Sequence, residues 1–486
     1  MNNPIRRLAA VVFAMFVALL VASTTIQFVQ AEELAERPGN RRTLLDSYNR
    51  DRGAILVQGE PIARSEPTSD DELRYLRSYP QGTRYAHVTG YFSFTYGAGS
   101  GLERAENSLL AGTDDSLFYR RLPDLLTGRE SKGASLETTV VPAVQRAADE
   151  ALGDRRGAVV ALDPRTGAVL AMVSHPSYDP NALSSHRLVA VDEAWAALNA
   201  DEGRPLVNRA IAGDLYPPGS VFKLVVAAAA LESGRYSPDS TLEAPLRYRL
   251  PGSDTTLPNF GGAACGPGEE ATLAESVRVS CNTSFAWLAG EVGAEALEAQ
   301  ARAFGFEQAL EVPMTVTPSS YPEGVDDAQL ALTGIGQHDV RVTPMQVAMM
   351  SAAIANDGVV MQPYLVDTVR DRSLEVIRRT DPQELSRAVE ADTAAQLTEM
   401  MVSVVQSGSG RAAALGGVQV AGKTGTAEYG SSGGAHAWFT GFAPAEDPTI
   451  AVAVIVESAT GDWTGETGGR VAAPVAQAVL QAGVNR

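Results

Sequence analysis

The sequence predicts an α+β fold, in which a large C-terminal domain contains an antiparallel sheet flanked by helices and a smaller mixed α/β module precedes it. The first observation is a hairpin pattern over residues 158–173, where two apolar runs flank a turn that contains Pro164 and Gly167. The second is the return of strand patterns near the C-terminus, at residues 418–426, 437–442 and 449–457. Helical patterns dominate between them, from residue 217 to about 410. We therefore expect one sheet assembled from both ends of the domain.

The N-terminus carries a segment that is apolar and long enough to cross a membrane. Residues 8–29 contain no Asp, Glu, Lys or Arg, and at about 1.5 Å per residue they can span a bilayer. Basic residues precede the segment and acidic residues follow it, which predicts a single-pass anchor with its N-terminus inside the cell: Arg6, Arg7, Glu32, Glu33 and Glu36. The alternative is a cleaved signal peptide, because Val29-Gln30-Ala31 has the small-residue pattern of a cleavage site. On either interpretation the remainder is exported.

Three regions follow along the chain: residues 1–31 as a cytoplasmic tip and anchor, 32–135 as a non-catalytic module, and 136–486 as the C-terminal domain. In the module, a strand is expected near residues 52–56, and the segment 83–92 is strand-like. We find no catalytic constellation there and expect a spacer or docking role.

The C-terminal domain opens with a helical pattern over residues 141–152, with Pro142 in its first turn and Gly153 after it. A helix is also expected near residues 470–484.

The remainder of the domain is organised around a turn that places Ser220 in the first turn of a helix, followed by Lys223 and an apolar run. A helix that is apolar on every side is buried. Burial lowers the pKa of a Lys and lets it act as a base toward a neighbouring nucleophile. The helix N-terminus would also favour a developing oxyanion.

Lysine is rare in this chain. Only three of the 39 Lys and Arg residues are Lys, namely Lys132, Lys223 and Lys423. A codon bias toward Arg explains the general pattern, but an Arg cannot be deprotonated in a protein whereas a buried Lys can. A Lys three residues after Ser220 therefore indicates a need for an amine at that position.

Two further motifs are weak when each is taken alone. Ser280-Cys281-Asn282 lies between two helical segments and could be no more than a helix N-cap. Lys423-Thr424-Gly425-Thr426 lies near the end of a predicted strand and could be a strand end with a glycine bulge.

In this order, however, the Ser-x-x-Lys, Ser-x-Asn and Lys-Thr-Gly motifs together resemble the penicillin-recognising acyl-serine transferases. The resemblance covers nearly the whole chain and includes further stretches: Glu137-Thr138-Thr139 with Gln145, residues 334–337 with Val342-Thr343-Pro344, and residues 437–444. The anchor together with Arg52-Gly53-x-Ile55 resembles class B penicillin-binding proteins, and among them the actinobacterial PbpA type.

The resemblance implies a peptidoglycan D,D-transpeptidase that is inhibited by β-lactams. It implies that Ser220 is the nucleophile and Lys223 its base, that Ser280 relays a proton to the leaving D-Ala, and that Asn282 orients Lys223 and binds the substrate amide. Lys423, Thr424 and Thr426, with Gly425 between them, would bind the terminal carboxylate. Backbone N–H groups of Ser220 and Thr426 would form the oxyanion hole.

No cofactor or metal is expected, since no clustered His or Cys offers ligands. The expected partners are stem peptides, β-lactam antibiotics, the cell membrane and other cell-wall synthesis proteins. The net charge of −19 argues against nucleic acid. In an exported chain, Cys265 and Cys281 are expected to form a disulfide, although Cys281 could instead be a small buried residue.

Three other functions compete with this interpretation. The segment from Gly417 to Thr424 formally matches a P-loop, but the strand lies between its two ends and glycines follow where a helix should begin. A D,D-carboxypeptidase or β-lactamase would use the same motifs with water as acceptor, although the long N-terminal module and anchor fit a synthase better. A catalytically silent β-lactam sensor is disfavoured because every acylation residue is present.

Overall fold

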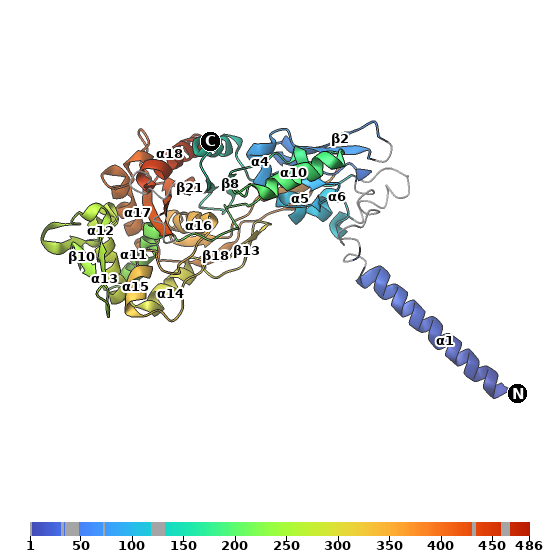
Figure 1. Cartoon of the computed structure of the whole chain (residues 1–486), viewed down its shortest axis with the longest axis horizontal. Helices are drawn as coiled ribbons and strands as arrows, with labels where there is room; N and C mark the ends of the chain where they lie inside the picture. Colours follow the sequence, from blue (N-terminus) through green and yellow to red (C-terminus); the bar gives the residue numbers. More distant parts are fainter. Residues whose placement is uncertain are drawn as a thin grey trace.

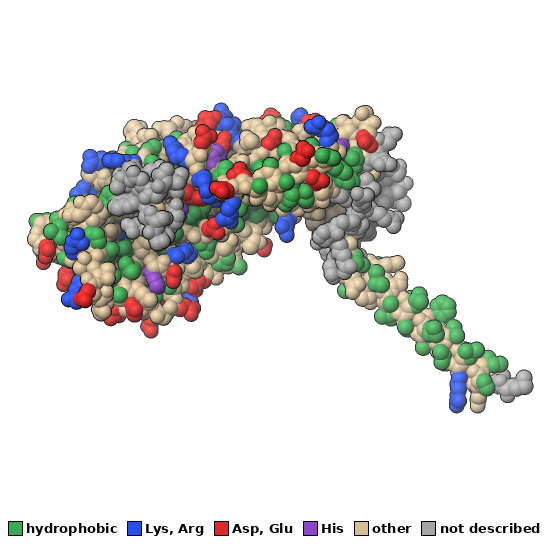
Figure 2. Space-filling model, in the orientation of Figure 1, with side chains coloured by type: hydrophobic (Ala, Val, Ile, Leu, Met, Phe, Trp, Pro, Cys, Tyr) green, Lys and Arg blue, Asp and Glu red, His purple; other side chains and the backbone are tan. Residues whose placement is uncertain are grey.

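The computed structural model describes residues 2–30, 34, 48–70, 73–117, 132–429, 434–457 and 467–486. Helix α1 (Asn2–Thr24) continues into a five-residue π-helix, Thr25–Val29. Within the described residues, one helix, spanning Asn3–Val29, is long and apolar enough to cross a membrane, and hydrophobic side chains are exposed along it (Figure 1 and Figure 2). The acidic residues on which the predicted orientation depends, Glu32, Glu33 and Glu36, lie outside the described residues, as does Ala31 of the alternative cleavage site.

A five-stranded antiparallel sheet lies at the centre of the C-terminal domain, in the order β19-β20-β21-β7-β8. Its strands are β7 (Gly157–Leu162), β8 (Val169–His175), β19 (Ala421–Tyr429), β20 (Gly434–Ala443) and β21 (Ile450–Val456). The predicted assembly of one sheet from the first hairpin and the last three strands is therefore confirmed. Strands β7, β20 and β21 are buried along their whole length, because helices cover both faces of the sheet.

Two terminal helices cover one face of this sheet. Helices α8 (Pro142–Leu152) and α18 (Ala473–Val484) pack together, and their apolar side chains share a core with Val159 and Val454. Helix α8 has the predicted bounds to within one residue. On the other face, α16 (Pro344–Ala355) shares a core with Val160 and Ile455. Successive side chains of each strand therefore pack alternately into two separate hydrophobic cores, one on each face of the sheet.

The helical region packs beside this sheet, with α11 (Lys223–Glu232) at its centre (Figure 1). Every residue of α11 from Lys223 to Leu231 is buried, as expected for a helix that is apolar all round. The surrounding helices are α12 (Leu273–Val279), α13 (Asn282–Val292), α14 (Ala294–Ala303), α15 (Asp327–Thr333) and α17 (Ala391–Gln406). Short two-stranded pairs decorate this region: β9 (Thr241–Glu243) with β12 (Glu270–Thr272), β10 (Arg247–Arg249) with β11 (Thr256–Pro258), β13 (Leu310–Glu311) with β14 (Thr315–Val316), and β15 (Val359–Met361) with β18 (Glu384–Arg387).

A second sheet of six strands, in the order β17-β16-β6-β1-β2-β3, belongs to the N-terminal module. Its strands are β1 (Ile55–Val57), β2 (Glu60–Pro67), β3 (Tyr75–Ser78), β6 (Ser135–Thr138), β16 (Val366–Arg370) and β17 (Val376–Arg379). Strands β1 and β6 pair in parallel, and β16 pairs with β6 antiparallel. Residues from far along the chain therefore complete the sheet. The division into 1–31, 32–135 and 136–486 stays a prediction.

The expectation of a strand over residues 83–92 is wrong, because Gly82–Thr89 form helix α4. Residues 85–89 are all buried, so polarity has no period in this segment, and the pattern alone could not separate a helix from a strand. Gly90, with φ of 70°, ends the helix. The other elements of the module are β4 (Phe92–Ser93), β5 (Gly97–Ala98), α5 (Gly101–Ala105) and α6 (Asn107–Ala111), and α9 (Asn181–Ser184) and α10 (Leu188–Ala200) follow in the C-terminal domain.

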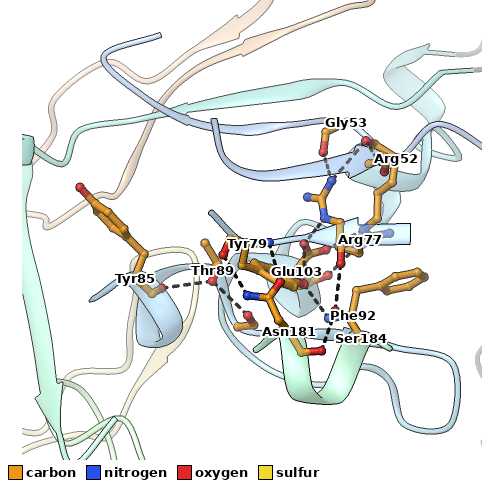
Figure 3. Close-up of polar contacts among 12 residues, drawn as sticks. Arg52, Gly53, Arg77, Tyr79, Tyr85, Thr89, Phe92, Glu103, Asn181 and Ser184 are labelled. Carbon is orange, nitrogen blue, oxygen red and sulfur yellow. Dashed lines mark hydrogen bonds and ion pairs between the residues drawn. The ribbon is translucent and has the colours of Figure 1, made fainter. Parts of the chain in front are cut away.

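A buried carboxylate holds the N-terminal module together (Figure 3). Glu103 on α5 accepts a hydrogen bond from Nε of Arg52 at 2.6 Å and from Nε of Arg77 at 2.6 Å. Tyr79 adds a third donor at 3.2 Å. Burial alone would raise the pKa of Glu103, but the two guanidinium groups outweigh it and hold this pKa below its ordinary value. A charged Glu103 is therefore part of the fold.

The same cluster connects the module to the C-terminal domain (Figure 3). Asn181 on α9 accepts a hydrogen bond from the backbone N–H of Tyr79 at 2.9 Å and donates one to its carbonyl at 3.0 Å. Ser184 donates to the carbonyl of Arg77 at 2.9 Å. Side chains of α9 thus pair with the backbone at the end of β3.

Candidate active site

Ser220 lies in a short 3-10 turn, Gly219–Val221, that leads directly into α11. Gly219 has φ of 53° and donates its N–H to the carbonyl of Gly336 at 2.9 Å. A Cβ atom at Gly219 would lie 2.7 Å from the carbonyl oxygen of Thr426. Glycine is therefore required here twice over, for its left-handed backbone and for the close approach of the Ser220 turn to β19.

Lys223 is the first residue of α11 and has no exposed surface. Its Nζ donates to the carbonyl oxygen of Ser280 and to Oδ1 of Asn282, both at 2.8 Å. Burial lowers the pKa of Lys223 well below its usual value, and the positive charge of Lys423 lowers it further.

The turn between α12 and α13 carries the second motif. Ser280 ends α12 in the left-handed conformation, with φ of 62°, and Asn282 begins α13. This uncommon backbone lets the carbonyl and the hydroxyl of Ser280 face different partners. The carbonyl accepts from Lys223, and the hydroxyl accepts from Nζ of Lys423 at 2.7 Å.

The third motif lies inside β19, where Lys423 is fully buried and also donates to the carbonyl of Thr424 at 2.9 Å. Burial lowers the pKa of Lys423 to about 7. At Gly425 a Cβ atom would lie 2.9 Å from Cβ of Trp438 and 3.1 Å from the carbonyl oxygen of Pro218. A side chain at position 425 would push the Ser220 turn away from the strand.

The two threonines of this motif differ in their surroundings. Oγ1 of Thr424 shares a hydrogen bond of 2.6 Å with Oγ of Ser409, and Thr426 is half-buried. Ser409 was not singled out from the sequence, although the run Ser407-Gly408-Ser409-Gly410 marks a loop there.

Asn259 is a further site residue that the sequence analysis missed. Its Oδ1 accepts the backbone N–H groups of Asn282 at 3.0 Å and Thr283 at 3.1 Å, so it caps α13 from a distant loop. The glycine-rich run after Asn259 indicates a turn. It gives no sign that Asn259 caps a helix that begins 23 residues later, at Asn282. The disulfide between Cys265 and Cys281 ties the same loop to the Ser280–Asn282 turn.

These contacts leave Lys223 arranged as a base. A neutral amine has two N–H bonds and one lone pair. With both N–H bonds donated to Ser280 and Asn282, the lone pair remains for a proton from a nearby hydroxyl, and Ser220 lies one helical turn away on the same face. The site therefore contains the parts of a serine acyltransferase. Within the described ranges, no group of three or more His, Cys, Asp and Glu side chains could hold a metal ion.

Comparison with known proteins supports the same conclusion. Residues 157–481 match the family model described as penicillin binding protein transpeptidase domain. The chain belongs to the class B penicillin-binding proteins. A second model, described as penicillin binding protein A dimerisation domain, matches residues 52–136 of this penicillin-binding protein.

Relatives resemble it along the whole chain. The peptidoglycan D,D-transpeptidase PbpA of Mycolicibacterium smegmatis is 46% identical over 99% of both chains, and that of Mycobacterium tuberculosis is 43% identical over the same shares. The structure of the penicillin G acyl-enzyme complex of penicillin-binding protein A from M. tuberculosis superposes with a TM-score of 0.85. It is 43% identical and covers 90% of this chain and 100% of that one.

Proposed function

We propose that this penicillin-binding protein cross-links peptidoglycan stem peptides through an acyl-enzyme on Ser220, and that the residues of the three motifs activate Ser220 and bind the substrate. The observation that carries the proposal is the position of Ser280, which accepts from both buried lysines. One residue thereby links the candidate base, Lys223, to the candidate carboxylate-binding charge, Lys423.

In the acylation step, Ser220 Oγ attacks the carbonyl carbon of the penultimate D-Ala while neutral Lys223 takes the hydroxyl proton. A C–O bond forms and the peptide C–N bond then breaks. Backbone N–H groups of Ser220 and Thr426 stabilise the oxyanion. The close packing of Gly219 against Thr426 supports this pairing, since it holds the two backbones together.

The leaving D-Ala must receive a proton on its nitrogen. Ser280 is the donor in this mechanism, because its hydroxyl accepts from Lys423 and therefore points its own proton elsewhere. Lys423, Thr424 and Thr426 bind the terminal carboxylate, and Asn282 binds the substrate amide and orients Lys223. The amine of a second stem peptide then attacks the acyl-enzyme, which restores the Ser220 hydroxyl.

The N-terminal helix supports a location at the cell membrane. We place α1 across the bilayer as a single-pass anchor, with Arg6 and Arg7 on the cytoplasmic side and the catalytic domain outside the cell. Other cell-wall synthesis proteins are its partners there. Protease protection of the full-length protein in oriented vesicles tests the orientation.

Mass spectrometry after reaction with penicillin tests the nucleophile. The full-length protein in detergent should gain one penicilloyl group on Ser220, whereas an adduct mapped to another residue would overturn the mechanism. Product analysis with paired stem peptides tests the acceptor. A cross-linked dimer supports the transpeptidase, and release of free D-Ala alone would make the enzyme a carboxypeptidase.

A further inference from the structure

A pocket of about 560 Å³ lies beside the segment that leads into the Ser220 turn, and Lys223 is not among its lining residues. Pro217, three residues before Ser220, forms part of its wall. Gln337 forms another part and follows Gly336, whose carbonyl accepts the N–H of Gly219. The pocket therefore shares its wall with the segment that carries the nucleophile, yet the acylation chemistry above uses none of its side chains.

A fixed ion pair closes one side of this pocket. Nε of Arg209 donates to Glu457 at 2.7 Å, and Tyr216 donates its hydroxyl to the same carboxylate at 2.8 Å. The other nitrogens of Arg209 donate to the carbonyls of Arg204 and Gly203. Because Arg209 is 3% exposed and each of its three side-chain nitrogens already donates a hydrogen bond, it is structural and offers little to a ligand.

The rest of the wall is positively charged and accessible. Arg156, Arg204 and Arg341 have side chains that are 42%, 47% and 36% exposed. The pocket contains four arginines against two carboxylates, Asp214 and Glu457, in a chain whose net charge is −19. Arg204 pairs with Asp214, which is 77% exposed. Nη1 of Arg341 donates to the carbonyls of His338 and Val340, and its Nη2 pairs at 3.4 Å with Asp339, which is 68% exposed. An exposed pair of this kind contributes little, so an incoming anion can replace it.

The sheet leads from the catalytic residues to this pocket. Strand β19 is at one end of the described five-stranded order, so its outer edge can pair with an extended peptide. Along β19 the order is Lys423, Thr424, Thr426 and then Ala427. Ala427 pairs with His436 on β20, and His436 lines the pocket. His436 lies on the inner neighbour of β19, level with the residue after Thr426, so a donor that runs along β19 from a carboxylate at Thr424 reaches the level of this pocket upstream of its scissile bond.

From this arrangement we infer that the pocket binds a carboxylate of the donor stem peptide, upstream of the scissile bond, through Arg204 and Arg341. The inference rests on the proposed function, because it takes its direction from the site of acylation. Guanidinium groups recognise carboxylates by charge-assisted and bidentate hydrogen bonds. The arginine pocket thus selects acidic donors and disfavours donors whose upstream carboxyls are amidated.

The test compares donor peptides that differ only in their upstream carboxyls. Full-length protein in detergent is given a stem peptide with free upstream carboxyls, the same peptide with those carboxyls amidated, and penicillin. In Arg204→Gln and in the double variant with Arg341→Gln, kcat/KM for the acidic peptide should fall about tenfold more than for the amidated peptide, which is the range of one charge-assisted contact. Arg165→Gln is the matched control. Arg165 is 54% exposed and pairs with Asp447, which is 79% exposed, outside the pocket.

Each alternative outcome decides the question. Equal losses for both peptides, or losses as large in the control, would overturn the pocket as a carboxylate site. A preference that follows amidation of the acceptor peptide instead would assign the pocket to the acceptor and overturn the donor inference. The proposed function fails separately, if wild-type protein takes up penicillin at Ser220 but makes no cross-linked product from either peptide.

Discussion

Nζ of Lys423 donates a hydrogen bond to Oγ of Ser280 at 2.7 Å, between a strand and a turn 143 residues apart in sequence. The contact is buried on the lysine side and joins the sheet to the helical region across the site. It orients the Ser280 hydroxyl, since an oxygen that accepts from an ammonium group directs its own proton elsewhere.

Removal of this hydroxyl tests the proton relay. Ser280→Ala should lower the rate of acylation by a stem peptide about a hundredfold, because Lys423 loses its side-chain partner and the leaving amine loses its proton donor. Stopped-flow or quenched-flow kinetics measure the effect. Ser284→Ala is the control, since Ser284 is a buried serine on the adjoining helix α13 and its Oγ has no hydrogen-bond partner among the described residues. Similar losses in both variants would contradict the relay.

The two lysines also predict a pH profile. Lys223 must be neutral, so kcat/KM should rise with pH as Lys223 loses its proton at a pKa well below the ordinary value. Lys423 must be charged to bind a carboxylate, and its pKa is about 7. For penicillin, kcat/KM should therefore fall above about pH 7. The methyl ester of penicillin lacks the carboxylate and should show no such fall; an identical fall for both compounds would contradict this role of Lys423.

Lys223→Arg separates a base from a structural cation. Arg keeps the charge but cannot give up its proton, so the folded variant should lose about a thousandfold in acylation by penicillin, within the range that general-base catalysis contributes. Acylation rates across pH, with circular dichroism as the check on folding, measure this. If the variant acylates within a few-fold of wild type, the Ser220 proton leaves by another route, with Ser280 the next candidate.

Asn259 is expected to act through Asn282. Asn259→Ala removes the acceptor for the first N–H groups of α13, which should cost about 1 kcal/mol of stability and misplace Asn282 and Lys223. Acylation should slow about tenfold, as measured with a fluorescent penicillin. Thr272→Ala is the matched control, because Thr272 caps the preceding helix, α12, through its own side chain and does not contact Asn282. Its acylation rate should stay near that of wild type.

Glu103→Gln tests the buried cluster of the N-terminal module. The change leaves Arg52 and Arg77 buried with a neutral partner, and such a loss typically costs about 3–5 kcal/mol. The module should open at lower urea concentration, as followed by limited proteolysis. Glu66→Gln serves as control, since the Arg64–Glu66 pair is about half exposed and should change stability by less than about 0.5 kcal/mol. Equal sensitivity of the two variants would contradict the role of Glu103.

The catalytic sheet and the buried helix after Ser220 could be predicted because their signals are local. Two apolar runs around a turn identify β7 and β8, and a longer apolar run identifies α11, without knowledge of distant residues. The hydrogen bond between Lys423 and Ser280 had no local signal, and the family resemblance implied only that both residues belong to one site. Asn259 was missed for a similar reason, since a cap donated from another loop leaves no pattern near the helix it caps.

The N-terminal module shows the other limit of sequence patterns. Residues 85–92 are all buried, in the last part of α4, in β4 and in the two residues between them, so they lack the alternation of buried and exposed positions that separates a helix from a strand. Strands β16 and β17 join a sheet whose other members end at residue 138, and no composition change marks this return. Pairing between distant strands is set by tertiary contacts, which a single sequence does not display.

The six-stranded sheet also imposes an order on biogenesis. Strand β6 ends at Thr138, but its neighbour β16 begins only at Val366. At synthesis rates of about 5–20 residues per second, roughly 10 to 45 s pass between the emergence of the two strands. Throughout that time the backbone groups of β6 are unpaired on one edge, the kind of edge that templates aggregation. Folding of this protein during its synthesis therefore depends on protection of the unfinished sheet until its last strands are made.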